Sequence, residues 1–434
     1  MNGDSRIERT LPLILEDLGR GTAPDYVDSL LGQTAAMRQR PGWTFIERWL
    51  PMSALTQRLA TAPRVPLRAV ALVALLILAL AAAALYVGSQ PHLPDPFGPA
   101  GNGVIPYVSN GDIYVGDLAT GTSRLLVGDP ADEALPQFSP DGTNVAFIRV
   151  GATGTGTPTI DIYVVRADGS DVKRITPQPI ADADWKWIGW TPDGGRIAVV
   201  HKVEYSGARC AVSFCFENQL DLFDASGNGS VQRIAAAAGL DSLQFRPPDG
   251  REVLISGHVN GSYGLYAMNA DGTNVHPLLL STDPESNDYW GGATYAADGG
   301  RIFYTRPYQR ETPVGTCCAL WVMNADGSDA HQFVPNAGTA WDGQPTVSPD
   351  GTRIAFWHGG VFVMPANGSG PLIETGPKLS GTVHWVWAPD SSKILMFPNG
   401  SHAKAYLLDP GGGPWTTVPW ASDDDIDWQR VAPH

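Results

Sequence analysis

The chain has 434 residues, more than one typical domain, and 43% of them are hydrophobic against 17% charged. Its 49 Gly and 36 Pro favour many tight turns over long helices. The formal net charge of −15 repels a phosphate backbone, which argues against nucleic acid as a partner.

The N-terminal segment, residues 1–65, is predicted to hold two short helices, over residues 7–18 and 24–38. Pro24 suits the first turn of the second helix, where its missing N–H costs nothing. A segment this short cannot bury a large core. It is therefore expected either to fold on a partner or to lie on a membrane surface.

A membrane span is predicted over residues 66–88, because Ala69 to Val87 is a run of nineteen residues without a charge. As a helix this run would be roughly 28 Å long, close to the hydrocarbon thickness of a bilayer. A cleaved signal peptide would be shorter and would lie near the start, whereas 68 residues precede this run. The positive-inside rule puts the N-terminus in the cytoplasm and the rest of the chain outside the cell. The arginines that set this orientation are Arg48, Arg58, Arg64 and Arg68.

After a linker over residues 89–102, the chain repeats itself over residues 103–434. One motif is an aromatic or apolar residue followed by Pro-Asp-Gly or a variant of it. Six copies are present, and their aspartates are 40 to 56 residues apart, which is the size of a four-stranded propeller blade. The six are Asp141, Asp193, Asp249, Asp298, Asp350 and Asp390.

Each motif is followed by short runs rich in β-branched and aromatic residues, the second of which ends in a turn of the Asp-Gly or Asn-Gly type. The unit is therefore four strands, named A to D, with the aromatic residue at the end of strand A. Residues 104–127 predict strands B, C and D without an A, and residues 425–433 predict an A strand with Trp428 in the place of Trp387. Six whole units and one divided unit make an all-β propeller of seven blades, closed by a blade split between N- and C-terminal strands.

Three phrases, FSPDG (138–142), IYVVRADGS (162–170) and LWVMNADGS (320–328), resemble the repeats of TolB-type propellers, also called WD40-like or PD40 repeats. The likeness covers residues 104–430. It implies a propeller that serves as a docking platform, a ligand-binding domain or an appendage of a peptidase. TolB itself is a soluble periplasmic protein with a six-bladed propeller, so the predicted span and the seventh blade depart from that family.

The segments that lead into the A strands are expected to line one mouth of the central channel, and most carry acids together with Trp or Tyr. Acids beside aromatic rings suit a cationic or sugar-like ligand or a basic peptide. The alternative is a solvated acidic rim with aromatic residues packed between blades. The residues predicted to bind the ligand are Asp182, Asp184, Trp185, Asp288, Trp290, Trp341, Asp342, His384 and Asp424.

Two kinds of residue invite a metal or redox interpretation. The Asp-Gly corners are predicted to cap their own turns rather than to bind calcium, and no metal or cofactor is predicted. The four cysteines lie in two pairs on a domain expected outside the cell, which indicates disulfides. A bond between Cys210 and Cys215 is the first choice, while a bond between Cys317 and Cys318 or a cross-pairing stays open.

The predicted function is non-catalytic: a membrane-anchored propeller that binds a protein or envelope ligand outside the cell. No Gly-x-Ser-x-Gly elbow and no Gly-rich phosphate loop occur in the sequence, and a hydrolase or lyase working in the channel is the least favoured alternative. A second hypothesis rests on the plan of a helical N-terminus, one span and an outer domain, which resembles that of bacterial anti-sigma factors. In it residues 1–50 hold a sigma factor at the membrane, although the His-x-x-x-Cys-x-x-Cys zinc motif of one such class is missing.

Overall fold

The computed structural model describes residues 71–81, 94–152, 158–181, 187–205, 215–259, 262–281, 292–307, 318–334, 342–379, 383–398, 403–422 and 426–432. The chain divides into two compact units, Met1–Gln90 and Pro91–His434.

The first unit holds one described element, a helix over residues 71–81 whose side chains are all exposed. None of the helices within the described residues is both long enough and apolar enough to cross a membrane. The predicted helices over residues 7–18 and 24–38 lie outside the described residues, as do both ends of the predicted span.

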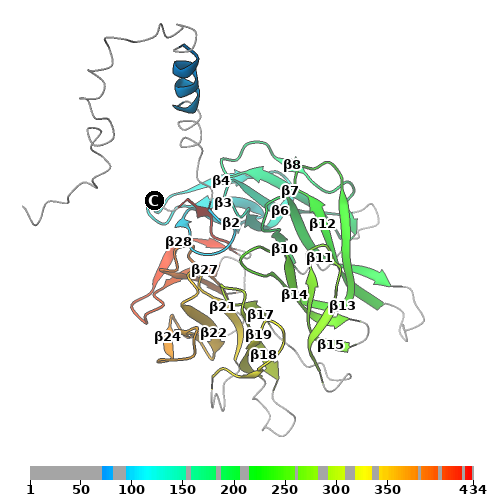
Figure 1. The fold of residues 1–434 in the computed structure, drawn as a ribbon, viewed down its shortest axis with the longest axis vertical. Helices are drawn as coiled ribbons and strands as arrows, with labels where there is room; N and C mark the ends of the chain where they lie inside the picture. The colour runs from blue at the N-terminus through cyan, green and yellow to red at the C-terminus, as the bar shows by residue number, and fades with distance from the viewer. Residues whose placement is uncertain are drawn as a thin grey trace, which may run out of the picture. The chain divides into compact units, whose positions relative to one another are not determined.

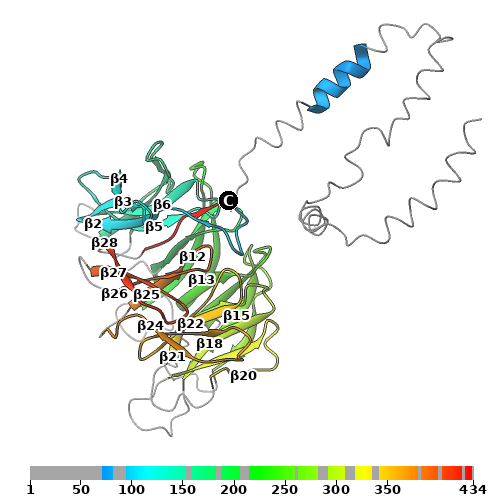
Figure 2. The same ribbon diagram turned by 90° about the vertical axis from the view of Figure 1, so that its left-hand side faces the viewer.

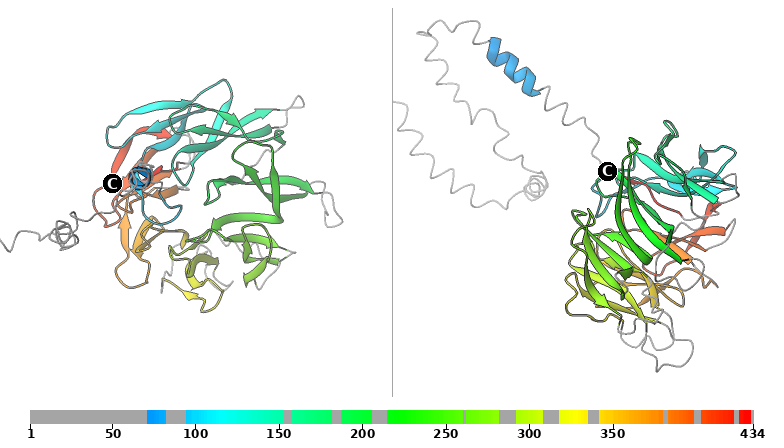
Figure 3. Two further views of the ribbon diagram at one scale, coloured as in Figure 1. Left: turned by 45° about the horizontal axis from the view of Figure 1, so that its top comes forward. Right: turned by 90° about the vertical axis from the view of Figure 1, so that its right-hand side faces the viewer.

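The second unit is a ring of small antiparallel sheets (Figure 1; Figure 3, left). Blade 1 holds β2 (Ile105–Ser109), β3 (Asp112–Gly116) and β4 (Ser123–Val127). Blade 2 holds β5 (Asp132–Phe138), β6 (Asn144–Ala152), β7 (Pro158–Arg166) and β8 (Lys173–Arg174). Blade 3 holds β10 (Trp187–Trp190), β11 (Arg196–Tyr205), β12 (Cys215–Asp224) and the first part of β13 (Val231–Phe245). Blade 4 holds the second part of β13, β14 (Glu252–Val259), β15 (Ser262–Asn269) and β16 (His276–Leu280). Blade 5 holds β17 (Ala293–Tyr295), β18 (Arg301–Pro307), β19 (Cys318–Asn324) and β20 (His331–Gln332). Blade 6 holds β21 (Asp342–Val347), β22 (Arg353–His358), β23 (Val361–Pro365) and β24 (Ile373–Thr375). Blade 7 holds β25 (Val383–Trp387), β26 (Ile394–Pro398), β27 (Ala403–Leu408) and β28 (Thr416–Ser422).

In blades 2 to 7 strands A to D follow one another in chain order, and the prediction of seven four-stranded blades is confirmed. A short extra strand, β9 (Ile180–Ala181), pairs with β7. Because neighbouring strands are antiparallel, the AB and CD turns lie on one face of the ring and the BC and DA connections on the other. We call these the AB/CD face and the DA/BC face.

The ring closes where the two ends of the propeller meet. Strand β29 (Arg430–Val431) pairs with β1 (Gly101–Asn102), and hydrogen bonds between Gln429 and residues 103–104 continue the contact. The C-terminal strand thus completes blade 1 as predicted, but its regular part is shorter than residues 425–433 and pairs with β1 instead of β2. On the other side of blade 1, β28 lies beside β2 (Figures 1 and 2).

Seven hydrophobic clusters fill the spaces between neighbouring blades, and each cluster takes residues from two adjacent blades. The cluster between blades 7 and 1 contains Tyr107, Trp420 and Trp428, and the rings of Tyr107 and Trp420 stack at 5.5 Å. Burying a side chain of this size contributes about 1.5–3 kcal/mol. The aromatic residues of the repeat are therefore what seals each blade to the next.

The Asp-Gly corners cap their own turns. Asp141 accepts hydrogen bonds from the Ser139 hydroxyl at 2.5 Å and from the Thr143 amide at 3.0 Å. Although burial acts to raise the pKa of Asp141, these hydrogen bonds hold it below its usual range. Asp193 and Asp350 accept the same pair of bonds in blades 3 and 6. The carboxylate at each corner is therefore occupied by its own turn.

Candidate functional site

Hydrogen bonds link the A strands of neighbouring blades at four junctions around the channel. In each case a main-chain or indole N–H of the last residue of strand A donates a hydrogen bond to the preceding blade. The acceptor residue lies one position before the equivalent residue of that blade. The bonds run from Trp190 Nε1 to the Gln137 carbonyl (3.0 Å), from the Tyr295 amide to Gln244 Oε1 (2.6 Å), from Trp387 Nε1 to the Thr346 carbonyl (3.1 Å) and from the Phe138 amide to Asp427 Oδ2 (2.7 Å).

Most residues predicted to bind a ligand at the DA/BC mouth lie outside the described residues. These are Asp182, Asp184, Trp185, Asp288, Trp290, Trp341 and Asp424. Asp342 begins β21 opposite His358 in β22, and the side chain of Asp342 is not described. His384 lies in β25, where its ring stacks on Phe397 with centroids 5.8 Å apart. The shared binding site thus stays a prediction, with His384 placed against an apolar neighbour.

A charged cluster lies at the DA/BC face of blade 2, and the sequence predicted only part of it. Glu133 is 1% exposed, and its Oε1 accepts hydrogen bonds from Arg149 Nε at 3.1 Å and Nη2 at 2.9 Å. The same Nη2 lies 2.6 Å from Asp129, and the guanidinium sits 4.4 Å from the centre of the Tyr163 ring. Glu133 Oε2 has no hydrogen-bond partner within the described residues. Burial raises the pKa of Glu133 to about 7, against the hydrogen bonds and charge of Arg149.

Glu133 lies in one of the acidic segments that lead into the A strands, and no role was predicted for Arg149. The signal was available, because Arg149 ends the apolar run of strand B and lies directly opposite Glu133 in the β5–β6 register. The main-chain amide of Glu133 also donates to the carbonyl of Gly111, in the BC turn of blade 1. The cluster therefore sits at the DA/BC face where blades 1 and 2 meet.

A histidine–aspartate pair is enclosed in blade 3. His201 Nε2 lies 3.1 Å from Asp221 Oδ2, and Gln219 donates to the same oxygen at 2.6 Å. Burial acts to raise the pKa of Asp221, but hydrogen bonds from His201 and Gln219 hold it below its usual range. Such a pair can act as a general base only if the imidazole reaches a substrate. His201 and Asp221 are each 5% exposed, so the pair serves the packing of this blade.

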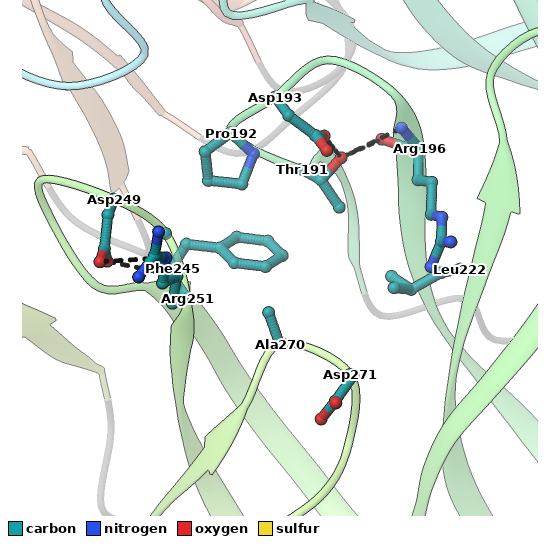
Figure 4. A pocket seen from close by; sticks show the side chains of 11 residues that line it. Thr191, Pro192, Asp193, Arg196, Leu222, Phe245, Asp249, Arg251, Ala270 and Asp271 are labelled. Carbon is teal, nitrogen blue, oxygen red and sulfur yellow. Dashed lines mark hydrogen bonds and ion pairs between the residues drawn. The ribbon is translucent and has the colours of Figure 1, made fainter.

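A cavity of about 360 Å³ lies between blades 3 and 4 on the AB/CD face. Figure 4 shows the ring of Phe245 directed into it, between the corner that carries Pro192 and the turn that carries Ala270. Its charged rim is formed by Asp193, Arg196, Asp249, Arg251 and Asp271. An apolar floor with a balanced charged rim is typical of a binding pocket for a small amphipathic group.

The AB/CD mouth of the channel is covered by the protein's own residues 94–98. Arg430 Nη2 donates to the main-chain carbonyls of Asp95 at 2.9 Å and Gly98 at 2.7 Å. Phe97 packs against the cluster between blades 3 and 4. A second cavity, of about 160 Å³, is lined by this segment together with Arg430 and residues of blades 4, 5 and 6. Part of the predicted linker is therefore a component of the channel mouth.

Within the part of the chain that the structure describes, no three His, Cys, Asp or Glu side chains form a group that could hold a metal ion. Cys318 is buried and disulfide-bonded. Cys210 and Cys317 lie outside the described residues, and Cys215 begins β12 with its side chain not described. The predicted pairing of Cys210 with Cys215 therefore stays a prediction.

The fold and its enclosed channel define a seven-bladed β-propeller protein. No family model matches the chain. The chain is 28% identical over 187 residues to the Tol-Pal system protein TolB of Anaeromyxobacter dehalogenans, a match that covers 43% of this chain and 37% of that protein. Its propeller is TolB-like.

Two further similarities concern enzymes. Dipeptidyl-peptidase 5 of Porphyromonas gingivalis is 32% identical over 90 residues, which are 20% of this chain and 13% of that protein. The periplasmic gluconolactonase of Pseudomonas aeruginosa superposes with a TM-score of 0.52 over 76% of this chain and 99% of that one, at 14% identity. A likeness at that identity shows the fold alone. The matches span well under half the length of TolB and of the dipeptidyl-peptidase.

Proposed function

We propose that this protein is a membrane-anchored, extracytoplasmic propeller that binds a protein or envelope ligand at the DA/BC mouth of its channel without catalysing a reaction. The observation that carries the proposal is the covering of the opposite mouth by residues 94–98. A ligand then approaches from the DA/BC face, where Glu133 and Arg149 form a charged cluster and where the predicted acids and aromatic rings lead into the A strands. The anchor is the predicted span over residues 66–88.

The test is capture of partners by the full-length protein from gently solubilised membranes. The triple variant Asp184→Asn, Trp341→Ala and Asp424→Asn alters the DA/BC mouth. A matched control alters two exposed acids and an exposed tryptophan in CD turns: Asp171→Asn, Asp329→Asn and Trp415→Ala. We expect the control to retain the captured partner and the mouth variant to lose it. Equal capture by both variants would contradict the proposal.

One observation favours a transducer as the second candidate. The residues that follow the predicted span are the ones that enter the channel mouth, so binding in the channel has a direct covalent route to the N-terminal segment. In this version residues 1–50 hold a cytoplasmic partner such as a sigma factor. Capture of that partner by the wild-type chain, and its loss when residues 1–50 are deleted, would support the transducer. Envelope partners captured equally with and without residues 1–50 would support the platform.

A catalytic role would need a base and an acid that face a cavity. The carboxylates that line the larger cavity, Asp193, Asp249 and Asp271, each accept hydrogen bonds within their own turns. Such linings suit recognition. The similarity to the peptidase and the gluconolactonase does not assign an activity to this chain, because one match covers 20% of it and the other shows the fold alone.

A further inference from the structure

The contact between residues 94–98 and the propeller has the features of a bound peptide. The segment belongs to no strand, although it lies against residues of several blades. Its polar anchor is Arg430, whose Nη2 donates to the main-chain carbonyls of Asp95 and Gly98 across a bend and so recognises a bent backbone without reading its side chains. Nε of Arg430 is buried and has no hydrogen-bond partner within the described residues. The anchor therefore has donor capacity that its present occupant does not use.

Side-chain specificity at this site comes from Phe97 and Gly98. The ring of Phe97 is partly buried against the cluster that contains Phe245 and Leu222. Gly98 ends the bend with φ = +81°, a backbone conformation that other residues adopt only with strain. Pro96 is exposed and contributes a fixed φ at the start of the bend over residues 96–98. The recognised pattern is proline, an aromatic residue and glycine.

Residues 94–98 leave part of the AB/CD mouth unfilled. The cavity of about 160 Å³ lies directly beside the segment and is lined by Tyr295, Gln244 and Ser348 as well as by Arg430. Tyr295 and Ser348 are each 1% exposed, so these groups line an enclosed space under the segment and not the outer surface. A longer or larger peptide would find unfilled space there, together with the unused Nε–H of Arg430.

We propose that the AB/CD mouth of the channel is a binding site for a bent peptide with a proline–aromatic–glycine pattern, in which residues 94–98 act as an exchangeable intramolecular ligand. An incoming peptide of a partner protein takes the two carbonyl contacts to Arg430 and places its ring where Phe97 lies. The proposal concerns the mouth opposite to the one assigned to the ligand above. Because residues 94–98 occupy this mouth until a matching peptide displaces them, other ligands still reach the channel from the DA/BC face.

The first test uses the full-length protein in mild detergent and a fluorescent peptide with the sequence of residues 93–100. An intramolecular ligand on a short tether competes at an effective concentration in the millimolar range. The variant Phe97→Ala weakens that competitor, so we expect it to bind the peptide at least about tenfold more tightly than the wild type does. The control Trp415→Ala removes an aromatic ring that is 43% exposed elsewhere and should match the wild type. A peptide with alanine in place of its phenylalanine should bind neither protein.

Two results of this test would overturn the proposal. One is equal affinity of the Phe97→Ala and wild-type proteins for the peptide. The other is binding that does not depend on the phenylalanine of the peptide.

A second measurement needs no variant and guards against misfolding of Phe97→Ala. Millimolar free peptide should displace residues 94–98 of the wild-type protein, so that hydrogen exchange of the amides in and next to this segment speeds up several-fold. The alanine-containing peptide should leave exchange unchanged. The amide of Ala100, which donates to the Pro389 carbonyl, reports on the end of the segment. Exchange that stays the same with both peptides would show that the segment is a fixed part of the fold.

Discussion

The two faces of the propeller use the same repeat in different ways. On the AB/CD face, corner aspartates such as Asp141 and Asp350 make the same hydrogen bonds in blade after blade. On the DA/BC face, one backbone position carries different chemistry: Glu133 lies opposite Arg149 in blade 2, and Asp342 begins the equivalent pair in blade 6. The comparison teaches that the corners specify the fold, while the DA ends are free to vary and so can carry function.

The acids of the two regions also differ in their pKa. Hydrogen bonds hold the pKa of Asp141 below its usual range. Burial raises the pKa of Glu133 to about 7 and that of Asp427, which accepts from the Phe138 amide in the channel wall, to about 6. The corner acids therefore stabilise the fold when ionised, whereas the channel acids favour their protonated forms. The pH dependence of stability separates the two groups.

The largest expected effect comes from breaking the ring on which both faces depend. Trp428 is 5% exposed in the cluster between blades 7 and 1, and its Nε1 donates to the Gly103 carbonyl at 3.2 Å. Trp428→Ala should lower the free energy of unfolding by about 3–5 kcal/mol, measured by urea denaturation. Trp415→Ala, at a ring 43% exposed, should cost less than about 1 kcal/mol. Similar losses in the two variants would mean that the divided blade does not hold the ring together.

A smaller effect sharpens the contrast at Glu133. Its pKa of about 7 in the folded state is above that of an unfolded glutamate, so the native state binds the extra proton between these values. The stability contribution is present at low pH and is lost as pH rises from about 4.5 to 7. Between pH 5 and pH 8 the wild type should lose on the order of 1–3 kcal/mol relative to Glu133→Gln. The exposed control Glu374→Gln should follow the wild type at every pH, and parallel curves for wild type and Glu133→Gln would refute the assignment.

The corner acids should show the opposite sign. Asp141→Ala removes three hydrogen-bond acceptances, from Ser139 and from the amide and hydroxyl of Thr143, and should cost about 1–2 kcal/mol at pH 7. Because the folded pKa is lowered, this contribution is present above the unfolded value and is lost as pH falls below about 4. The difference between wild type and Asp141→Ala should therefore shrink between pH 5 and pH 3. A difference independent of pH would show that the loss comes from packing alone.

The fold was predictable because its signals are local and repeated. Each corner motif specifies its own turn, and Trp428 could be matched to Trp387 by pattern. The covering segment could not be found in this way, because Phe97 is a single aromatic residue in a Pro- and Gly-rich stretch and its anchor Arg430 is 332 residues from Gly98. Contacts between distant, unrepeated residues carry no sequence pattern. Arg149 is different, because it lies opposite Glu133 within one hairpin and can be found once the strand register is assigned.

The smallest effect concerns the hydrogen bonds that join the A strands. Thr346 Oγ1 accepts from Trp385 Nε1 at 2.7 Å, while its carbonyl accepts from Trp387. Thr346→Val keeps the shape and the carbonyl bond but leaves the indole N–H of Trp385, 8% exposed, without this acceptor. The expected loss is about 1 kcal/mol in the free energy of unfolding, and Thr346→Ser, which keeps the hydroxyl, should recover most of it. Equal free energies of unfolding for Thr346→Val and Thr346→Ser would contradict this. The wall of the channel would then be stabilised by packing between blades, and the hydrogen bonds at strand A would contribute no stability of their own.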